Sequence, residues 1–422
     1  MSNYTLKERM VAKALSKFPT IKKRIKKIYS TINYLIYRKK YKILVNKEVV
    51  EEIKQVVNNE NQESFFGYYD KYPMNSEGWV ISNLTPNDTR IEPLKDSKIQ
   101  ILLTNIYTNE EIIVGESNSY NWQQGCRAQW LNNDMVIFNT FNEEKGYISK
   151  VFSLEQRSII KEYDLPVQDS YNNDYFLSLN YQRLYTLTID YGYNNLRKLS
   201  VTELLNTNND GIYYVDCITS EYKLIFSLED IINCDKKNIF DNSIHSVNHI
   251  MINPDGKSFI FIHRYYRENV RYDRLIYSDF KNLKVLVDED MVSHCCWINN
   301  EVVLGYLRYN NNDKYFYINT NSNITEEDKV ISSLNLGDGH PNGNNDFIVF
   351  DTYPNKSRNQ TLFLNKRNEK INVKLLEVFH SLRFNDASRC DMHPRSSINS
   401  KYVFFDSVYN SDKRQHYYIK LK

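Results

Sequence analysis

The chain has 422 residues, of which 41% are hydrophobic and 25% charged, and its formal net charge is +2. This composition is typical of a soluble globular protein with a hydrophobic core. Without a run of about 18 apolar residues, a membrane-spanning helix is excluded. The six cysteines follow no evenly spaced pattern and no secretory signal precedes them, so we expect a cytoplasmic protein without a disulfide framework. The small net charge gives no indication of a nucleic-acid partner.

Residues 1–47 form a basic extension that contains fourteen Lys and Arg but one acidic residue, Glu8. Apolar residues recur at helical spacing through residues 4–45, and Pro19 is expected to divide this stretch into two helices. Basic amphipathic helices bind anionic membranes, which would hold the protein peripherally at the inner membrane face. The alternative is a basic helical extension packed on the body of the protein, or partly disordered. Residues 48–62 indicate a linker with a short helix.

A strand–turn–strand unit recurs from residue 63 to the end of the chain. Abundant Tyr (34) and Phe (20) with only 12 Gly favour strands, and the turns are rich in Asn, Asp and Gly. Such units occur in any all-β protein, but seven copies with matched ends are typical of a β-propeller. We therefore predict an all-β, seven-bladed β-propeller over residues 63–422, preceded by a short basic α-helical extension. The seven copies are residues 68–83, 124–139, 168–180, 249–263, 294–305, 340–351 and 393–406.

The opening residue of each copy is expected to lie at one mouth of the central channel. All eight histidines lie at residue 245 or later, and four of them open consecutive copies. Converging imidazoles suit metal ligation or proton transfer, and with nearby Cys and Asp side chains they could hold Zn²⁺ or Mn²⁺. The alternative is that they bond strand-end carbonyls. The seven opening residues are Tyr69, Gln124, Gln168, His249, His294, His340 and His393.

A second polar group follows the fourth copy, in the segment FIFIHRYYRENVRYDR (259–274). Arg is a bidentate binder of carboxylates and Tyr can stack on sugar rings, so the segment suits an acidic oligosaccharide. The alternative is a solvated loop after a strand. Asp351 and Asp406 each end a second strand, where we expect them to cap turns.

Several motifs together resemble a known family. They are FFGYYDKYP, NWQQGCRAQW, NHIMINPDGKSFIFIHR, MVSHCCW, GDGHPN, FDTYP and RCDMHPR. They resemble the seven-bladed propellers related to oligogalacturonate lyases and ulvan lyases, within the TolB-like propeller superfamily, over about residues 63–422. The resemblance implies a lyase-like, carbohydrate-active protein that acts on or binds an acidic, uronate-containing polysaccharide, in bacterial surface polysaccharide metabolism.

The resemblance also implies roles for individual residues. It places a divalent metal, Zn²⁺ or Mn²⁺, at His294, His340 and His393, with Cys390 as a co-ligand. It makes His249, His263, Arg264 and Tyr266 the candidates for base, acid and carboxylate neutraliser. We assign Tyr69, Gln124, Arg267 and Arg395 to substrate binding. Copies one to three contain no histidine, so a base drawn from an early blade would have to be Tyr69 or Gln124.

Two other functions remain open at this point. One is a non-catalytic propeller scaffold that binds glycan or protein. The other is a glycosyltransferase-like role in capsule or surface polysaccharide biosynthesis, for which the sequence shows no nucleotide-sugar motif. Formation of an unsaturated product from uronate polymers would distinguish the lyase from both.

Overall fold

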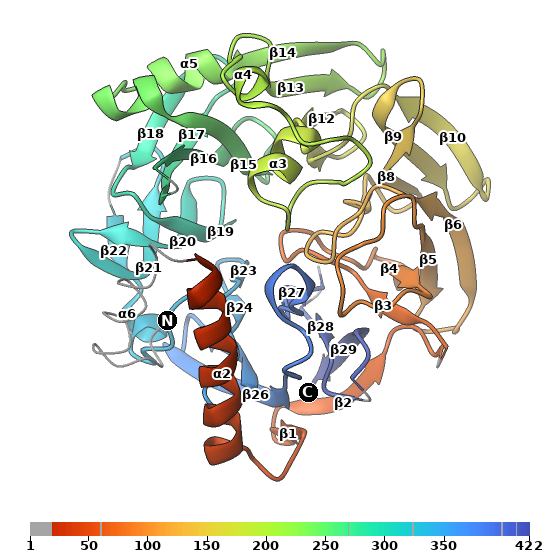
Figure 1. Ribbon diagram of the computed structural model, residues 1–422. Helices are drawn as coiled ribbons and strands as arrows, with labels where there is room; N and C mark the ends of the chain where they lie inside the picture. Colours follow the sequence, from red (N-terminus) through yellow and green to blue (C-terminus); the bar gives the residue numbers. More distant parts are fainter. Residues whose placement is uncertain (1–18, 60, 269, 323–324, 398–399, 411) are drawn as a thin grey trace.

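A computed structural model describes residues 19–422 apart from 60, 269, 323–324, 398–399 and 411, with side chains described from residue 24 onward. The described residues form seven antiparallel sheets arranged around a central axis (Figure 1). Each of the seven sequence copies falls in the inner half of a different sheet, so the predicted seven-bladed propeller is confirmed. The blades are numbered 1 to 7 in chain order.

In blades 1 to 5 the strands run outward from the channel in chain order. Blade 1 holds β3 (Glu63–Phe65), β4 (Trp79–Thr85), β5 (Ile99–Asn105) and β6 (Glu111–Ser117). Blade 2 holds β7 (Gln129–Trp130), β8 (Met135–Asn142), β9 (Gly146–Ser153) and β10 (Ser158–Tyr163). Blade 3 holds β11 (Asp169–Tyr171), β12 (Tyr175–Ser178), β13 (Gly211–Asp216) and β14 (Tyr222–Ser227). Blade 4 holds β15 (Ile244–Ile252), β16 (Phe259–Arg267), β17 (Val270–Ser278) and β18 (Leu283–Val287).

The remaining blades complete the ring. Blade 5 holds β19 (Val292–Trp297), β20 (Val302–Tyr309), β21 (Asn312–Asn319) and β22 (Thr325–Glu327). Blade 6 holds β23 (Asn342–Gly343), β24 (Phe347–Asp351), β25 (Asn359–Lys366), β26 (Ile371–Phe379) and β1 (Ile43–Val45). Blade 7 holds β27 (Arg395–Ser396), β28 (Tyr402–Ser407), β29 (Gln415–Leu421) and β2 (Val50–Gln55).

The N-terminal segment therefore closes the ring. β2 pairs antiparallel with β29, with Ile53 opposite Ile419, and supplies the outermost strand of blade 7. The expectation of a linker with a short helix over residues 48–62 is wrong at this point. Val-Glu-Glu-Ile-Lys-Gln has little intrinsic strand preference, and its conformation is set by the free edge of β29, which needs a hydrogen-bonding partner.

The helices lie outside the blades. The N-terminal helix α2 (Pro19–Tyr37) begins at the proline that the sequence marks as a boundary and crosses the front of blade 6 in Figure 1. The first predicted helix lies outside the described residues. No helix in the described ranges is long and apolar enough to cross a membrane. The other helices are α3 (Tyr181–Leu187), α4 (Val201–Leu204), α5 (Leu228–Asn233) and α6 (Lys329–Ser332), with 3₁₀ turns η2 (Asn238–Asn242) and η3 (Asp386–Ser388).

An insertion in blade 3 explains the long interval between the third and fourth copies. It connects β12 to β13, carries α3 and α4, and contains the loop with Asp190 and Tyr191. The ring of Tyr191 lies 4.8 Å from that of His249, and Asp190 accepts a 2.5 Å bond from Arg389. The insertion thus brings two polar side chains to the residues of blades 4 and 7 that form the candidate site.

Candidate functional site

Breaks in strand register change the direction of two of the histidines that open the sequence copies, His249 and His294. The pairing of β15 with β16 shifts between Asn248 and Met251, and His249 lies in the gap with a left-handed φ of 53°. The pairing of β19 with β20 shifts in the same way around His294. Bulges of this kind turn a side chain away from its regular strand face. His393 also has a left-handed φ, 45°, and such backbone strain clusters at functional sites.

Four histidines from blades 4 to 7 form an arc around Tyr68 and Tyr69. Ring centroids are 4.1 Å apart for His294 and His340 and 4.3 Å apart for His340 and His393. His249 lies 6.3 Å from His294 at the other end of the arc. The Tyr69 ring lies 5.5 Å from that of His340. The matched register of the copies therefore brings their opening histidines together.

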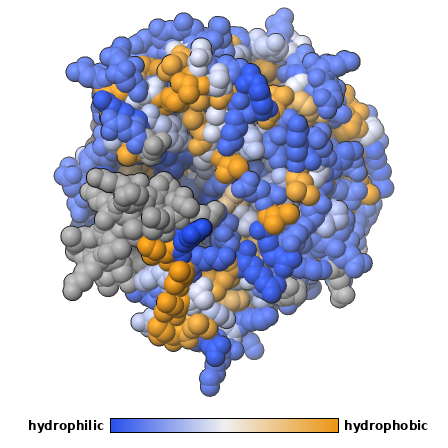
Figure 2. Space-filling view, in the orientation of Figure 1, coloured by the Kyte–Doolittle hydropathy of each residue, from blue (hydrophilic) through white to orange (hydrophobic). Residues whose placement is uncertain are grey.

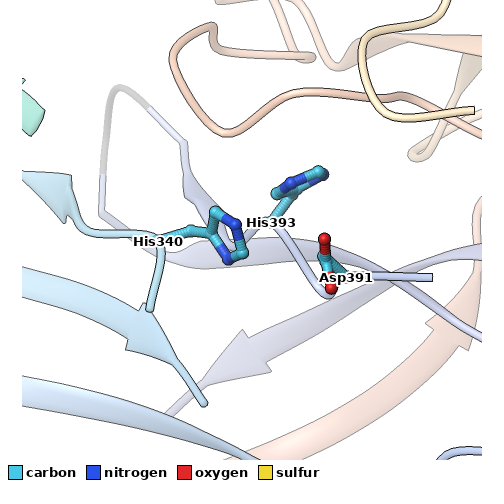
Figure 3. A group of neighbouring side chains, drawn as sticks. All are labelled: His340, Asp391 and His393. Carbon is cyan, nitrogen blue, oxygen red and sulfur yellow. The ribbon is translucent and has the colours of Figure 1, made fainter. Parts of the chain in front are cut away.

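Within the arc, His340, His393 and Asp391 form a compact cluster. One potential ligand atom from each lies within 4.8 Å of the others, and all three side chains are buried. Figure 3 shows the two imidazoles and the carboxylate facing a shared space. We refer to these residues as the His340–Asp391–His393 cluster.

The hydrogen bonds of this cluster leave two imidazole nitrogens free. His393 donates from Nδ1 to the carbonyl oxygen of Gly67 at 2.7 Å, and His340 Nδ1 lies 2.8 Å from Asp351. Within the described residues, both Nε2 atoms are buried without a hydrogen-bond partner. Metal-ligating histidines show the same pattern, with one nitrogen bonded to a carbonyl or carboxylate and the other left for the ion. Two imidazoles and a carboxylate therefore fit a divalent cation such as Mn²⁺ or Zn²⁺.

The charge states of His393 and Asp391 suit this role. Burial lowers the pKa of His393 well below its ordinary value, and the neighbouring His340 lowers it further. Burial also opposes protonation of His340, but Asp351, Asp391 and Asp338 together outweigh it and raise the pKa of His340 overall. Burial alone would raise the pKa of Asp391, whereas Arg389 and His340 lower it below the ordinary value. Asp391 is therefore an ionised carboxylate, the form that binds cations.

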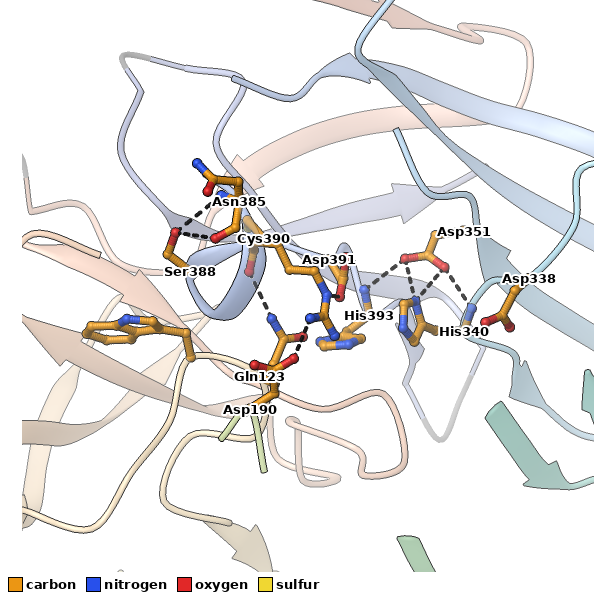
Figure 4. A network of polar contacts seen from close by, with 12 residues as sticks. Gln123, Asp190, Asp338, His340, Asp351, Asn385, Ser388, Cys390, Asp391 and His393 are labelled. Carbon is orange, nitrogen blue, oxygen red and sulfur yellow. Dashed lines mark hydrogen bonds and ion pairs between the residues drawn. The ribbon is translucent and has the colours of Figure 1, made fainter. Parts of the chain in front are cut away.

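Asp351 positions both histidines of the cluster, which goes beyond the turn-capping role that the sequence suggested. Its carboxylate accepts the backbone N–H of His340 at 2.7 Å and that of His393 at 3.2 Å, besides the bond to the His340 ring. Figure 4 shows the carboxylate between the two residues. One buried group on β24 thus fixes the relative placement of ligands from blades 6 and 7.

Replacing Asp351 with asparagine is expected to lower the affinity for Mn²⁺ by about 10- to 100-fold, because the carboxylate that orients His340 loses its charge. Isothermal titration calorimetry with the metal-free protein measures this change. The matched control is Asp328→Asn, since Asp328 is a buried carboxylate that caps α6 outside the site and asparagine caps equally well. Equal Mn²⁺ affinities in the two variants would remove Asp351 from the positioning role.

Arg389 borders the cluster and links it to the blade 3 insertion. Its guanidinium donates to Asp391 at 2.6 Å and to Asp190 at 2.5 Å, and 26% of its side chain is exposed. Figure 4 shows Asp190 and Asp391 on this network, with Gln123 bonded to the Arg389 carbonyl oxygen. The partly exposed guanidinium of Arg389 therefore places a positive charge next to the His340–Asp391–His393 cluster.

Cys390 is not a ligand in this geometry, contrary to the prediction. Its side chain is fully buried against Phe384 and Val408, and burial raises the pKa of its thiol to about 12. Side chains alternate along an extended segment, so residues 391 and 393 face the channel while 390 and 392 face the core. From the sequence, nearby Asp side chains were among the possible ligands but Cys390 was chosen, and the spacing Asp-x-His in RCDMHP was the signal in favour of Asp391.

His294, the remaining predicted ligand, lies beside the cluster without joining the group of three. Its Nδ1 lies 3.1 Å from Asp338, which also accepts the hydroxyl of Ser293 at 2.7 Å. Burial lowers the pKa of His294, and His340 lowers it further. It is therefore a neutral, carboxylate-oriented imidazole at the edge of the cluster.

Two of the four predicted catalytic residues lie at the site. The hydroxyl of Tyr68 is 2.9 Å from His249 Nδ1, and burial, followed by Arg264, lowers the pKa of His249 well below its ordinary value. Arg264 pairs with Asp273 at 2.9 Å, and its guanidinium lies 5.7 Å from the centre of the Tyr191 ring. One of its terminal nitrogens, Nη1, is buried without a partner among the described residues.

Of the other two, His263 lies away from the site, and Tyr266 lies two residues beyond Arg264 on β16. Arg274 donates to His263 Nδ1 at 2.8 Å, so His263 must donate from Nε2 to His245 Nδ1 at 2.9 Å. Both nitrogens of His263 are thereby occupied inside blade 4, which excludes it as a general base. Its position next to Arg264 on β16 turns it to the opposite face of the sheet. Tyr266 is half-buried and bonds Thr188 at 2.9 Å.

Of the four predicted substrate-binding residues, some lie at the site and others do not. Tyr69 is buried in the arc, but its hydroxyl is bonded to the backbone of Cys295 at 3.0 Å. Gln124 is buried with no partner for its amide among the described residues, and it lines a small, water-sized pocket with Tyr68. Arg267 is half-buried at the end of β16. Arg395 is wrong as a binding residue, because it is fully buried in an ion pair with Asp406 at 3.1 Å.

No family model matches the sequence, and no curated protein matches it significantly. Two solved structures have a similar fold. One is an oligogalacturonate lyase from Vibrio parahaemolyticus, with a TM-score of 0.56, 14% identity, and coverage of 90% of this chain and 96% of that chain. The other is an oligogalacturonate lyase in complex with manganese, with a TM-score of 0.58, 11% identity, and coverage of 91% and 98%. At such identities the likeness concerns the fold, and the chain shares the propeller fold of these lyases.

Proposed function

We propose that this protein is a metal-assisted lyase that cleaves an acidic, uronate-containing polysaccharide by β-elimination. The observation that carries the proposal is the His340–Asp391–His393 cluster, with its two free imidazole nitrogens, next to a neutral His249 and the cations Arg264 and Arg389. The fold shared with two oligogalacturonate lyases, one of them in complex with manganese, supports it.

Each step of the elimination has a residue suited to it. His340, Asp391 and His393 would hold the divalent cation, which supplies positive charge to a uronate carboxylate as the neighbouring C–H bond is broken. Arg264 and Arg389 offer further positive charge to the same carboxylate. His249 is neutral at pH 7 and can take the C5 proton, which it can then return to the departing oxygen.

Replacing His249 with asparagine is expected to lower the rate of product formation by about 100-fold or more, because the general base is lost. Asparagine tolerates the left-handed backbone at this position. The measurement is the ultraviolet absorbance of the unsaturated product from pectic, ulvan-like and capsular uronate polymers with Mn²⁺ present. The matched control is His245→Gln, a buried histidine on the same strand outside the site. Equal rates in the two variants would contradict the role of His249.

A second candidate is favoured by the burial of the arc, in which no histidine is more than 5% exposed. Such burial suits a non-catalytic propeller scaffold in which a cation fastens blades 6 and 7 together. It predicts metal binding and thermal stabilisation by metal without any unsaturated product from the three classes of polymer. The two candidates thus agree on the metal and differ on the product. A place in surface polysaccharide metabolism and a cytoplasmic location remain part of the proposal under either candidate.

A further inference from the structure

The N-terminal helix α2 has its apolar face turned away from the protein. It packs on blade 6 through the buried Asn33 and through Tyr34, whose ring lies 5.4 Å from that of Phe379 on β26. The opposite side carries five large apolar side chains that are each 42–66% exposed. They are Ile25, Ile28, Ile32, Leu35 and Ile36, which we call the outer stripe.

The outer stripe is continuous. At 100° per residue its five members fall within about a third of the helix circumference, and Figure 2 shows an apolar band along the helix. A surface helix of a globular protein normally buries such a stripe against the core. A contiguous exposed stripe of Ile and Leu marks a surface that contacts something else.

The charges around the outer stripe indicate the kind of partner that it contacts. Arg24 and Lys27 are exposed beside it on the helix, and Arg38, Lys40 and Lys42 are exposed just after it. Residues 1–47 hold fourteen basic residues and one acidic residue, which leaves 40 basic and 51 acidic residues in the remainder of the chain. The N-terminal segment that contains α2 is therefore strongly basic, whereas the remainder of the chain is acidic overall.

From this arrangement we infer that the outer stripe of α2 docks on an anionic lipid bilayer. Exposed branched apolar side chains can enter the headgroup region while flanking Lys and Arg contact acidic headgroups. A second copy of the chain is a poorer partner, since pairing two such helices would bring two strongly positive segments together. The acidic body would be repelled by the same membrane, which orients the molecule with α2 towards the lipid.

The test uses the full-length protein and vesicles of phosphatidylcholine with or without phosphatidylglycerol. Co-sedimentation is expected with the phosphatidylglycerol vesicles, and raising NaCl from about 0.1 M to about 0.5 M should weaken it. Ile28→Asp and Ile32→Asp are each expected to reduce the bound fraction by about tenfold, because a charge replaces a docking side chain. The matched control Ile218→Asp changes a side chain that is 77% exposed in blade 3 and should leave binding unchanged.

Three results would overturn the inference. The first is a wild-type protein that anionic vesicles do not retain at all. Binding that survives in both Asp variants would place the lipid contact outside the outer stripe. Concentration-dependent dimerisation that the same variants abolish, measured by light scattering without lipid, would assign the stripe to a second copy. The metal affinity of each variant is measured in parallel and should equal that of wild type, so this outcome is independent of the proposed lyase activity.

Discussion

Replacing His393 with asparagine is expected to weaken Mn²⁺ and Zn²⁺ binding by more than about 100-fold, because the cluster loses one of its two imidazole ligands. Asparagine tolerates the left-handed φ of residue 393, and its shorter side chain does not extend to the position of the imidazole Nε2. Calorimetric titration of metal-free protein should show one site per chain in the wild type. Saturating metal should raise the wild-type Tm and leave that of the variant nearly unchanged.

A second ligand variant and a control variant complete this experiment. His340→Ala removes the second imidazole at an ordinary backbone conformation and should give the same loss. His416→Asn removes a buried histidine in the same blade as His393, where it bonds Ser82 at 2.8 Å, and should bind metal normally. Undiminished binding in both cluster variants, or the absence of a stoichiometric site in the wild type, would contradict the assignment of the cluster as a metal site.

Acidification from pH 6.5 to about 4 is expected to destabilise the fold steeply. All eight histidines are buried, and the pKa of every one except His340 is lowered, to about 4 for His245 and about 3 for His380. In this window the unfolded chain binds protons that the folded chain does not, so stability falls as the pH falls. His245 alone contributes a loss on the order of 3 kcal/mol, a large part of the 5–15 kcal/mol typical of folded proteins. His340 acts in the opposite sense, since its raised pKa adds stability that is lost as the pH rises through it.

Urea unfolding midpoints at several pH values between 7.5 and 4, with a chelator present, measure this dependence. His245→Gln should flatten it, because the glutamine amide can accept from His263 and donate to the Phe240 carbonyl oxygen in place of the imidazole, without titrating. Replacing an exposed residue such as Tyr222 with glutamine provides the baseline. If the His245 variant and the wild type show the same pH dependence, the hydrogen-bonded pair His245 and His263 does not control acid stability.

The propeller could be predicted from the sequence because each blade is locally encoded. Every copy combines apolar strands with an Asn- or Gly-rich turn, and neighbouring strands within a copy need no distant partner to be recognised. β2 could not be predicted in this way. Its strand conformation depends on β29 at the other end of the chain, and its own sequence gives no sign of that partner.

The candidate site was predictable in part for the same reason. The register of the copies brings His249, His294, His340 and His393 together, as expected. Two features of the site depend on which face of an extended segment each side chain occupies. One is that Asp391, and not Cys390, belongs to the metal cluster. The other is that His263 is excluded as the general base. For Cys390 and Asp391 the face follows from side-chain alternation, and for His263 it is fixed by the hydrogen bond from Arg274, which no repeat pattern reveals. Asp190 and Tyr191 come from an insertion that the repeat does not include.

The pairing of β2 with β29 also bears on the order in which the molecule can form. β2 is synthesised long before β29, so the ring stays open and β2 has no strand partner until β29 has emerged from the ribosome. Contacts of such long sequence separation are slow to form, and unpaired edges are prone to aggregate. Late folding, rather than low stability once folded, is therefore the point at which this chain would depend most on chaperones.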